Sequence, residues 1–394
     1  MELNGREITV VGAGIAGLAA ALALSRQGAV VTVLEQAEAV REFGAGFQIT
    51  PNGARVLEGL GLGKPLSALS LLSHGVEIID GPTGRRVIRL DLARLRPREP
   101  HRFVRRPDLI ALLFDAVREA GVTLRLNARV LAADVTGQTV RLNLAGGETH
   151  EAHLLIGADG IHSPVRAAVE GEDSTQPFFT GQVAWRAVVR GEAEPVAQVH
   201  TGPGRHLVTY PLPRGLRNIV AVEERASWAA EDWRAVDDPA NLRAAFAGFA
   251  PPVRRLLAEV DEVHLWGLFR HGLVQHWHRG AAIVIGDAAH PTLPFLAQGA
   301  NMALEDAWLI AATLAAAPDA EQGFSDFVRL RRARVARLVA AANANARNYH
   351  LTGASRQAAH MVLRVGGMLA PSAAIGRFDW IYRYDPVGAS RMGG

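Results

Sequence analysis

The sequence predicts an α/β protein in which a parallel-sheet domain is interrupted by a smaller sheet domain and followed by a helical C-terminal region. Its 394 residues suffice for two or three domains. Two apolar, β-rich runs at 8–11 and 30–34 flank an apolar helical stretch, which is the order of a β-α-β unit. Short alternating runs replace this pattern over 178–270, and helical periodicity returns from Asn301.

The turn after the first strand carries glycines at fixed spacing. Gly12, Gly14 and Gly17 open the first helix, which we expect to end near Gln27. Such glycines allow a tight turn, close approach of the backbone to a pyrophosphate, and close packing of helix on strand. N–H groups at the helix start then face the phosphates, and Glu35 at the end of the second strand can accept from a ribose. The pattern indicates a dinucleotide site without separating NAD from FAD, and a glycine-rich turn without a ligand is the alternative.

Further elements follow from periodicity and turn residues. Pro107 stands near the start of a helix. Runs at 122–126, 129–135 and 139–144 read as a small antiparallel meander, and residues 281–285 as a buried strand. We expect a parallel-sheet domain formed by residues 1–72, 99–177 and 271–345. An inserted sheet domain would be formed by residues 73–98 and 178–270. Residues 346–394 would form a helical tail.

Composition excludes several kinds of chemistry. The chain has no cysteine, which rules out disulfides, thiolate nucleophiles and Cys-based metal sites. Lys64 is its only lysine, and the sequence around it is not a phosphate-binding loop. No histidine pair has the spacing of a metalloprotease site, so we expect no metal. The formal net charge is only +3 and the arginines are scattered, so we expect no nucleic-acid partner.

Two segments need separate interpretation. The apolar run from Ile8 to Leu24 could be a signal peptide, but Glu2 precedes it and three glycines interrupt it. We therefore expect a cytoplasmic protein, and no run of ~20 apolar residues predicts a membrane span. Five arginines of the predicted C-terminal helix read as a solvated face: Arg329, Arg331, Arg332, Arg334 and Arg337.

Two later motifs separate the possible cofactors. Asp159 lies in Gly-Ala-Asp-Gly and Asp287 in Gly-Asp-Ala-Ala-His-Pro, each at the end of an expected strand. In this order, and together with the first glycine cluster, they resemble the single-component (group A) flavoprotein aromatic hydroxylases of the para-hydroxybenzoate hydroxylase fold. The pattern is most similar to that of salicylate, 3-hydroxybenzoate and 6-hydroxynicotinate monooxygenases. The resemblance runs from Ile8 to about Asp306.

This resemblance implies a Rossmann-like FAD-binding domain with an inserted substrate-binding sheet domain. It implies FAD as cofactor and NADH or NADPH as co-substrate, without a separate coenzyme domain. Arg106 would contact FAD, Asp159 belongs to a motif linked to both FAD and NAD(P)H, and Asp287 would bind the ribityl chain. The other cofactor-binding residues implied are Gly12, Gly14, Ala16, Gly17, Glu35, Gln36, Val130, Gly299, Ala300 and Asn301.

Catalysis would rest on His206 and Tyr210, with Gln48, from segment 44–52, near the flavin ring. Residues four apart in a strand point to the same face, so His206 and Tyr210 can converge on one hydroxyl. Removing a phenol proton makes the ring a better nucleophile, and histidine has a suitable pKa for this step. Plain structural roles are the alternative for all three. The expected substrate contacts are Pro294, Phe295 and Arg186, although Phe295 departs from the polar residue of some relatives.

The implied activity is hydroxylation of a small phenolic or hydroxy-N-heteroaromatic acid through a flavin C4a-hydroperoxide, with O2 as co-substrate. One alternative is a flavin reductase or oxidase on the same fold without oxygen transfer. Another, of a different class, is a non-catalytic flavin- or nucleotide-binding protein. An NAD-dependent dehydrogenase would leave both later motifs unexplained. We expect a monomer or homodimer. The substrate, the position of hydroxylation, loss of carbon dioxide, and the choice between NADH and NADPH stay open.

Overall fold

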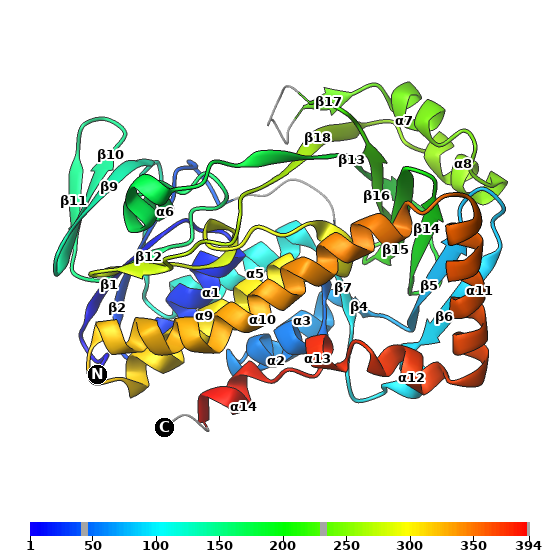
Figure 1. Cartoon of the computed structure of the whole chain (residues 1–394). Coiled ribbons are helices and arrows are strands. Elements are labelled where there is room, and N and C mark those ends of the chain that lie inside the picture. The colour runs from blue at the N-terminus through cyan, green and yellow to red at the C-terminus, as the bar shows by residue number, and fades with distance from the viewer. Residues whose placement is uncertain (41–45, 229–234, 392–394) are drawn as a thin grey trace.

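The chain folds around two large sheets, and its computed structural model describes residues 1–40, 46–228 and 235–391 (Figure 1). The first sheet is parallel except for its edge strand β19, which runs antiparallel to β20. Within the described ranges its six strands lie in the order β19 (His278–Arg279), β20 (Ala282–Val284), β12 (Leu155–Gly157), β1 (Glu7–Val11), β2 (Val30–Leu34) and β8 (Thr123–Arg125). The β-α-β unit expected from the first glycine cluster is therefore confirmed.

Helix α1 (Ile15–Ser25) is the centre of this domain. Every residue from Ile15 to Leu24 is buried, as expected for a helix that is apolar all round. It packs against helices α9 (Gly299–Ala316) and α5 (Arg106–Glu119). Helix α10 (Ala320–Tyr349) lies along α9 and spans the length of the molecule (Figure 1).

A small antiparallel sheet follows β8 in the chain. It contains β9 (Val130–Thr136), β10 (Thr139–Leu144) and β11 (Thr149–Ala152). The run at 122–126, expected to be part of this meander, is instead β8 of the parallel sheet, where Thr123 pairs with Thr32. That strand is only three residues long, too short for its sequence to show which sheet it joins.

The second sheet is mostly antiparallel, and only β14 and β5 pair in parallel among its described strands. Its eight strands lie in the order β17 (Val236–Asp237), β18 (Val263–Arg270), β13 (Phe178–Arg190), β16 (Leu216–Glu224), β15 (Arg205–Leu212), β14 (Val196–Gly202), β5 (Gly75–Asp80) and β6 (Arg86–Asp91). All of them come from the two segments that we assigned to an inserted domain, and the exact domain boundaries stay a prediction.

The two faces of the second sheet pack against different parts of the chain. On one face, the buried side chains of Trp185 and Leu207 pack in one cluster with Phe246 and Leu257. These two residues belong to the region of helices α7 (Pro239–Ala245) and α8 (Pro251–Ala258). The opposite face, here called the inner face, packs with Phe295 and Ala346. A third sheet contacts β15 of the second sheet and contains β3 (Gly46–Ile49), β7 (Arg102–Arg105) and β4 (Ser70–Leu72).

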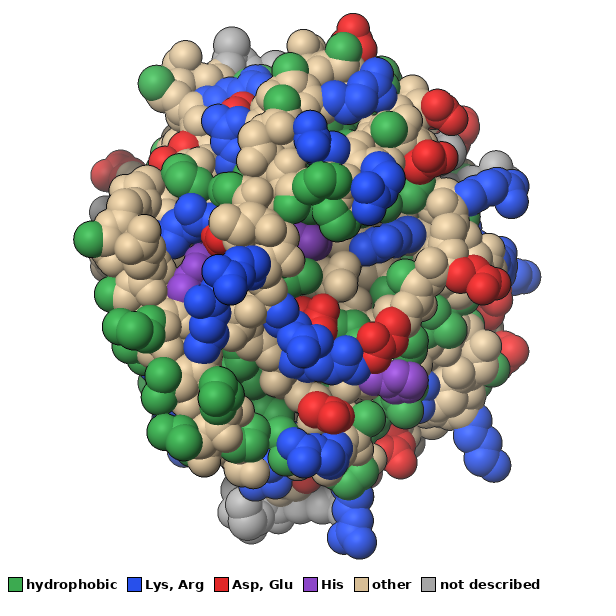
Figure 2. All heavy atoms as spheres, turned by 90° about the vertical axis from the view of Figure 1, so that its right-hand side faces the viewer, with side chains coloured by type: hydrophobic (Ala, Val, Ile, Leu, Met, Phe, Trp, Pro, Cys, Tyr) green, Lys and Arg blue, Asp and Glu red, His purple; other side chains and the backbone are tan. Residues whose placement is uncertain are grey.

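The C-terminal region is helical, as expected. Helix α10 continues through residue 346, where we placed the start of this region, and the domain boundary stays a prediction. Helix α11 (Gly353–Leu369) packs on β6 and exposes apolar side chains, among them Met368 and Leu369. Figure 2 shows this side of the molecule, where Lys and Arg side chains are interspersed with acidic and apolar ones.

The remaining elements are short connections. They are α2 (Pro51–Gly59), α3 (Gly63–Ala68), α4 (Leu92–Leu95), α6 (Pro164–Glu170), α12 (Pro371–Gly376), α13 (Asp379–Tyr382), α14 (Pro386–Arg391) and the 3-10 turns Gly171–Asp173, Gly286–Ala288 and Pro294–Leu296. Of all the helices in the described part of the chain, none has the length and apolarity that crossing a membrane requires.

Candidate active site

The glycine turn after β1 has the geometry that a pyrophosphate needs. Gly12 has φ +101°, and a Cβ there would lie 2.4 Å from the carbonyl oxygen of Ala158. A Cβ on Gly17 would lie 1.9 Å from the carbonyl oxygen of Gly12, so helix and turn pack too closely for any side chain. A Cβ on Gly14 would meet no atom within 4 Å, which leaves room for a ligand to reach the backbone. These are the three roles that such glycines have in dinucleotide sites.

Glu35 lies beside this turn at the end of β2. Its Oε2 accepts a hydrogen bond from the N–H of Ala13 at 2.7 Å, and its Oε1 accepts from the N–H of Ala37 at 2.8 Å. Each carboxylate oxygen can accept a second bond, so ribose hydroxyls can still bind there. The Glu35 carbonyl accepts from Ala128 at 2.8 Å, two residues before the buried Val130. The structure thus brings these predicted residues to one edge of the sheet, with Gln36 exposed beside them.

Arg106 and Asp287 form the next part of the site. Burial lowers the pKa of Arg106, and the charge of Asp287 partly opposes this shift. Asp287 is exposed, yet desolvation by the surrounding protein raises its pKa. The charges of His290 and Arg106 oppose this shift of the Asp287 pKa. The guanidinium of Arg106 also stacks on Phe47, 5.1 Å from the ring centroid.

Asp159 has a different environment at the end of β12. Its Oδ1 accepts a hydrogen bond from the Ser163 hydroxyl at 2.5 Å, and its Oδ2 accepts from the N–H of Val165 at 3.3 Å. Burial raises the pKa of Asp159 to about 6, although these bonds favour the carboxylate. Asp159 therefore anchors the start of α6 as well as standing next to the glycine turn, where Ala158 contacts Gly12.

Asn301 fixes the loop that was expected to hold the flavin ring. Its amide group donates to the carbonyl oxygens of Gln48 at 2.9 Å and Ala297 at 2.6 Å, and accepts from the N–H of Thr50 at 3.0 Å. Ala297 has φ +54°, a conformation that costs energy for a residue other than glycine and is concentrated at functional sites. The loop is thus held in a defined, strained shape against β3.

The start of α9 is the part of this loop that can stabilise negative charge. Gly299 and Ala300 form its first turn and are partly exposed, so their N–H groups supply the positive end of the helix dipole. Ala16 lies against Gly286, since a Cβ on Gly286 would meet its methyl group at 2.9 Å. The Gln48 side chain is half-buried, and residues 44 and 45 of its segment lie outside the described residues.

A buried network of charges supports this loop, and it corrects one of our predictions. Arg331 and Arg334 were expected on a solvated helix face, but Arg331 is completely buried and Arg334 nearly so. Both bind Glu305, and Arg331 also binds Asp306 at 2.7 Å. Asp306 in turn accepts from His290 at 2.6 Å. The ion pairs satisfy charges that burial would otherwise make very costly.

The inner face of the second sheet carries one predicted substrate residue and two predicted catalytic residues. Ala184 pairs with Val222, and Val222 pairs with His206, so these three side chains share a face. Arg186 lies two residues beyond Ala184, and Tyr210 lies four beyond His206, which places both on the same face. The register therefore brings Arg186, His206 and Tyr210 together on the side that faces the first domain.

Arg186 is a positive charge that forms no ion pair with an acidic side chain in the described part of the chain. Its guanidinium stacks 4.2 Å above the Trp266 ring, and its buried Nε has no hydrogen-bond partner among the described residues. Burial and the nearby charge of Arg106 lower its pKa to about 10, so it stays protonated at neutral pH. The two positive charges repel each other, and an anion bound to Arg186 would relieve this repulsion.

His206 is buried among aromatic rings. Its ring centroid lies 5.0 Å from that of Phe295 and 5.1 Å from that of Tyr349. Burial lowers the pKa of His206 well below its ordinary value, so the ring is neutral at pH 7. Phe295 is itself buried, whereas the preceding Pro294 is exposed.

The Tyr210 hydroxyl binds a backbone carbonyl, whereas we expected it to converge with His206 on a substrate hydroxyl. Its hydroxyl donates to the carbonyl oxygen of Gly46 at 2.7 Å, and its ring stacks on Phe103 with centroids 4.9 Å apart. Burial raises the pKa of Tyr210 above its usual value, so it keeps its proton. It can accept a hydrogen bond from a ligand, but it is not a base.

Sequence reasoning missed several residues of this site. Helix α10 repeats buried positions at Phe324, Phe327, Arg331, Val335 and Leu338, so its apolar spacing could have identified Arg331 as buried. Nothing in the sequence pointed to His350 and Glu224, which continue a hydrogen-bond chain from His206. Across the described residues, no group of three or more His, Asp or Glu side chains could hold a metal ion.

Comparisons with known proteins agree with this geometry. The family model described as FAD binding domain matches residues 6–342. A 3-amino-4-hydroxybenzoate 2-monooxygenase from Streptomyces platensis is 34% identical over 396 residues, which cover 97% of each chain. A 3-hydroxybenzoate 6-hydroxylase from Polaromonas naphthalenivorans is 33% identical over 361 residues, which cover 89% of each chain.

The solved structures lead to the same family. The structure of a salicylate hydroxylase substrate complex matches with a TM-score of 0.83 and 25% identity, covering 99% of this chain and 98% of that one. The shared fold extends over both large sheets and the C-terminal helices, because nearly the whole chain is covered. The glycine turn, Glu35 and Asp287 fit the cofactor that defines the family. The chain therefore belongs to the FAD-binding-domain family and is an FAD-dependent aromatic monooxygenase.

Proposed function

We propose that this enzyme hydroxylates a small hydroxy-aromatic acid whose carboxylate binds Arg186 and whose hydroxyl group binds His206. The observation that carries this proposal is the charge of the inner face. Arg186 is a desolvated cation beside a second guanidinium, that of Arg106, and forms no ion pair with a described acidic side chain. A carboxylate is the ligand group that fits a planar guanidinium best.

His206 is the base of the proposed reaction. It is neutral at pH 7, and its Nε2 has no hydrogen-bond partner among the residues that the structure describes. A phenolic or hydroxypyridine hydroxyl can therefore donate to this nitrogen. Proton removal increases the electron density of the ring, which promotes attack on an electrophilic oxygen. Tyr210 would orient the ring rather than take the proton.

FAD, reduced by NADH or NADPH, supplies the oxygen-transfer chemistry when bound. The chain would hold its ADP half with the glycine turn and Glu35, and its ribityl region with Asp287 and Arg106. The N-terminal turn of α9 would stabilise negative charge on the reduced ring system. Phe295 and Trp266 give the site apolar walls that exclude water from the reacting atoms.

Relatives support the proposed substrate class. The two relatives described above are named for 3-amino-4-hydroxybenzoate and 3-hydroxybenzoate, each of which combines one carboxylate with one ring hydroxyl. Arg186 and His206 offer one partner for each of these two groups. We also propose that the enzyme works in the cytoplasm, because a chain without cysteine, and hence without disulfides, suits a reducing compartment. We further propose that it is a monomer or homodimer.

The proposal is tested by an absorbance spectrum of the purified protein, followed by turnover assays. Purified protein should be yellow, and oxidation of NADH or NADPH should be measured with salicylate, 3-hydroxybenzoate, 3-amino-4-hydroxybenzoate and 6-hydroxynicotinate, with products checked by mass. Addition of one oxygen to a panel member supports the proposal. His206→Gln should retain FAD but slow hydroxylation by about a hundredfold or more. Reduction that yields only peroxide with every panel acid would contradict the proposed substrate class.

A further inference from the structure

A chain of three side chains links the buried site to the surface. A hydrogen bond of 2.7 Å joins His206 Nδ1 and His350 Nε2. A second one, also of 2.7 Å, joins His350 Nδ1 and Glu224 Oε1. His206 belongs to β15, Glu224 to the end of β16, and His350 directly follows α10. Three separate elements therefore meet in one continuous hydrogen-bonded path.

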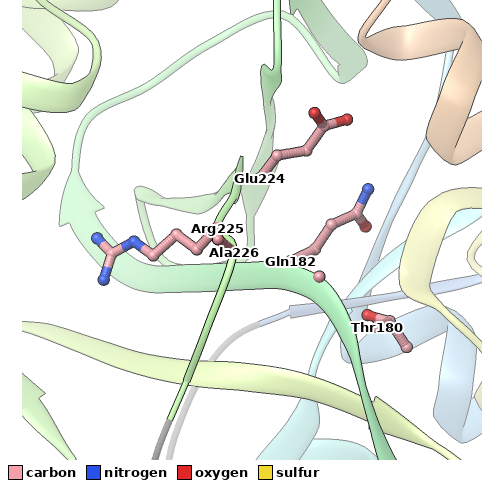
Figure 3. Close-up of a pocket in the computed structure, with 6 residues that line it drawn as sticks. Thr180, Gln182, Glu224, Arg225 and Ala226 are labelled. Atoms are coloured by element: carbon pink, nitrogen blue, oxygen red, sulfur yellow. The ribbon is translucent and has the colours of Figure 1, made fainter.

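The two ends of this path lie in different environments. His206 is completely buried, whereas the Glu224 side chain is 53% exposed. Glu224 lines a surface cavity of about 360 Å³ together with Thr180, Gln182 and Arg225. Figure 3 shows the Glu224 and Gln182 side chains on the same side of the sheet, while Arg225 points away from them. One end is thus sealed from water, and the other is open to it.

The carboxylate at the outer end fixes the direction of every bond. Glu224 as a carboxylate can only accept, so the proton of that bond belongs to His350 Nδ1. His350 Nε2 of the neutral ring is then an acceptor, and the proton of the inner bond belongs to His206 Nδ1. His206 Nε2 consequently carries a lone pair and no proton. The outer carboxylate therefore selects the tautomer that makes the buried nitrogen a base.

We propose that His206, His350 and Glu224 form a proton relay that moves the hydroxyl proton of the bound substrate to the surface. This inference rests on the proposed function of His206. The substrate O–H bond breaks as an N–H bond forms at His206 Nε2. The proton on His206 Nδ1 moves to His350 Nε2, and the proton on His350 Nδ1 moves to Glu224, which exchanges it with water. The reverse movement restores the starting tautomers when the product hydroxyl regains a proton.

The groups around the relay keep both imidazoles neutral, as proton hopping requires. Burial lowers the pKa of His350, Glu224 opposes this shift, and Arg205 adds to it. His206 faces His350 and the ring of Tyr349, and burial together with His350 lowers its pKa. The Tyr349 hydroxyl lies 3.4 Å from the carbonyl oxygen of Phe295, to which it donates, so it does not compete for His206. In the resting form each ring carries a single proton, which it hands on as it receives another.

The test measures deprotonation of a bound ligand, apart from turnover. Oxidised holoenzyme without NADH or NADPH is mixed in a stopped-flow instrument with whichever of the four panel acids binds most tightly, and phenolate absorbance is followed. Glu224→Gln keeps an oxygen that accepts from His350 but cannot take up its proton. We expect the deprotonation rate to fall tenfold to a hundredfold, on the order of a general-base effect, at unchanged Kd. Glu224→Asp, which keeps a carboxylate, should recover part of the rate.

The neighbouring Glu223 provides a matched control. It lies on the opposite face of β16, where it pairs with Arg205 at 3.2 Å and Arg225 at 3.1 Å. Glu223→Gln makes the same chemical change next to the relay and should leave the deprotonation rate within about twofold of wild type. His350→Gln should slow deprotonation as Glu224→Gln does, and the double variant should be no slower than the singles, because both interrupt one path.

The outcomes separate this inference from the proposed function. A Glu224→Gln variant that deprotonates its ligand at the wild-type rate, or no more slowly than Glu223→Gln, overturns the relay while the proposed substrate class stands. A loss of ligand affinity with an unchanged deprotonation rate gives Glu224 a merely structural role and also overturns the relay. If the wild type neither binds nor hydroxylates any panel acid, the proposed function is wrong and the relay fails with it.

Discussion

Arg331 donates a hydrogen bond from its Nε to Oδ1 of Asp306 at 2.7 Å, although both side chains are completely buried. The other oxygen of Asp306 accepts from the N–H of Gly286 at 2.9 Å and from His290 at 2.6 Å. Burial alone would raise the pKa of Asp306, but the charges of His290 and Arg331 lower it to about 2. The pair therefore holds the backbone of Gly286 directly beside the cofactor-site residue Asp287.

Removing the cation from this pair should destabilise the whole domain. Arg331→Met leaves Glu305 and Asp306 buried with fewer counter-charges, and breaking a buried ion pair costs about 3–5 kcal/mol. We expect a decrease of this size in the free energy of unfolding of the holoenzyme, measured with urea. Arg329→Met is the control, because Arg329 is exposed on the same helix and its ion pair with Asp326 contributes only about 0–1 kcal/mol. Equal losses in the two variants would contradict the network.

Two glycines of the first turn should respond to alanine in opposite ways. Gly14→Ala adds a methyl group where no atom lies within 4 Å, so the apoprotein should keep its stability. The same methyl group fills the approach to the backbone, and we expect FAD to bind at least about tenfold more weakly, or about 1.4 kcal/mol. Fluorescence titration of the apoprotein with FAD measures this change.

Gly17→Ala is the matched comparison. Its methyl group would lie 1.9 Å from the carbonyl oxygen of Gly12, so the turn or the helix must move. We expect a loss of about 1–3 kcal/mol in apoprotein stability, as for other overpacked sites. If Gly14→Ala destabilises the apoprotein as much as Gly17→Ala does, then Gly14 is a packing residue and the assigned roles are wrong.

Arg186→Met tests the proposed contact with the substrate carboxylate. A hydrogen bond to a charged group contributes about 1.5–3 kcal/mol, so Kd for the acid should rise about ten- to hundredfold. The neutral amide of the same acid should lose less affinity. Arg190→Met on the same strand is exposed and serves as control. Equal weakening of acid and amide would show that Arg186 acts through packing on Trp266 rather than through its charge.

Local patterns in the sequence predicted the parts of the site that lie on single elements. The glycine turn, Glu35 and Asp287 each follow a short apolar strand, and the structure places each at the end of that strand. The spacing of His206 and Tyr210 correctly predicted that both face the same side of one strand. Periodicity is a property of a few consecutive residues, so it is visible without any knowledge of tertiary packing.

The partners of these residues could not be predicted in the same way. His350 and Glu224 are separated by 126 positions in the chain, and the hydrogen bond between them depends on how α10 lies against the second sheet. Tyr210 was expected to bind a substrate hydroxyl, but its hydroxyl donates to Gly46, 164 positions away. Such contacts depend on the relative position of two domains, which no local pattern encodes.

Buried neutral histidines should make the protein sensitive to acid, and His101 offers a test. Its side chain packs edge-on against the Tyr382 ring at 4.8 Å, and burial lowers its pKa to about 4. Between about pH 6.5 and 4 the unfolded chain binds a proton at this residue that the folded chain does not bind, so stability falls as the pH falls. His101 alone should account for about 2 kcal/mol of the stability lost between pH 8 and pH 5.

His101→Phe keeps an aromatic ring at this position and removes the titrating group. The free energy of unfolding of the variant should decline less than that of wild type between pH 8 and pH 5, by about 2 kcal/mol, in urea titrations at both values. His153→Phe changes an exposed histidine and should decline as wild type does. An equal decline in all three proteins would mean that the folded state also protonates His101 in this range. In that case Tyr382 and the C-terminal helices do not shield it from water.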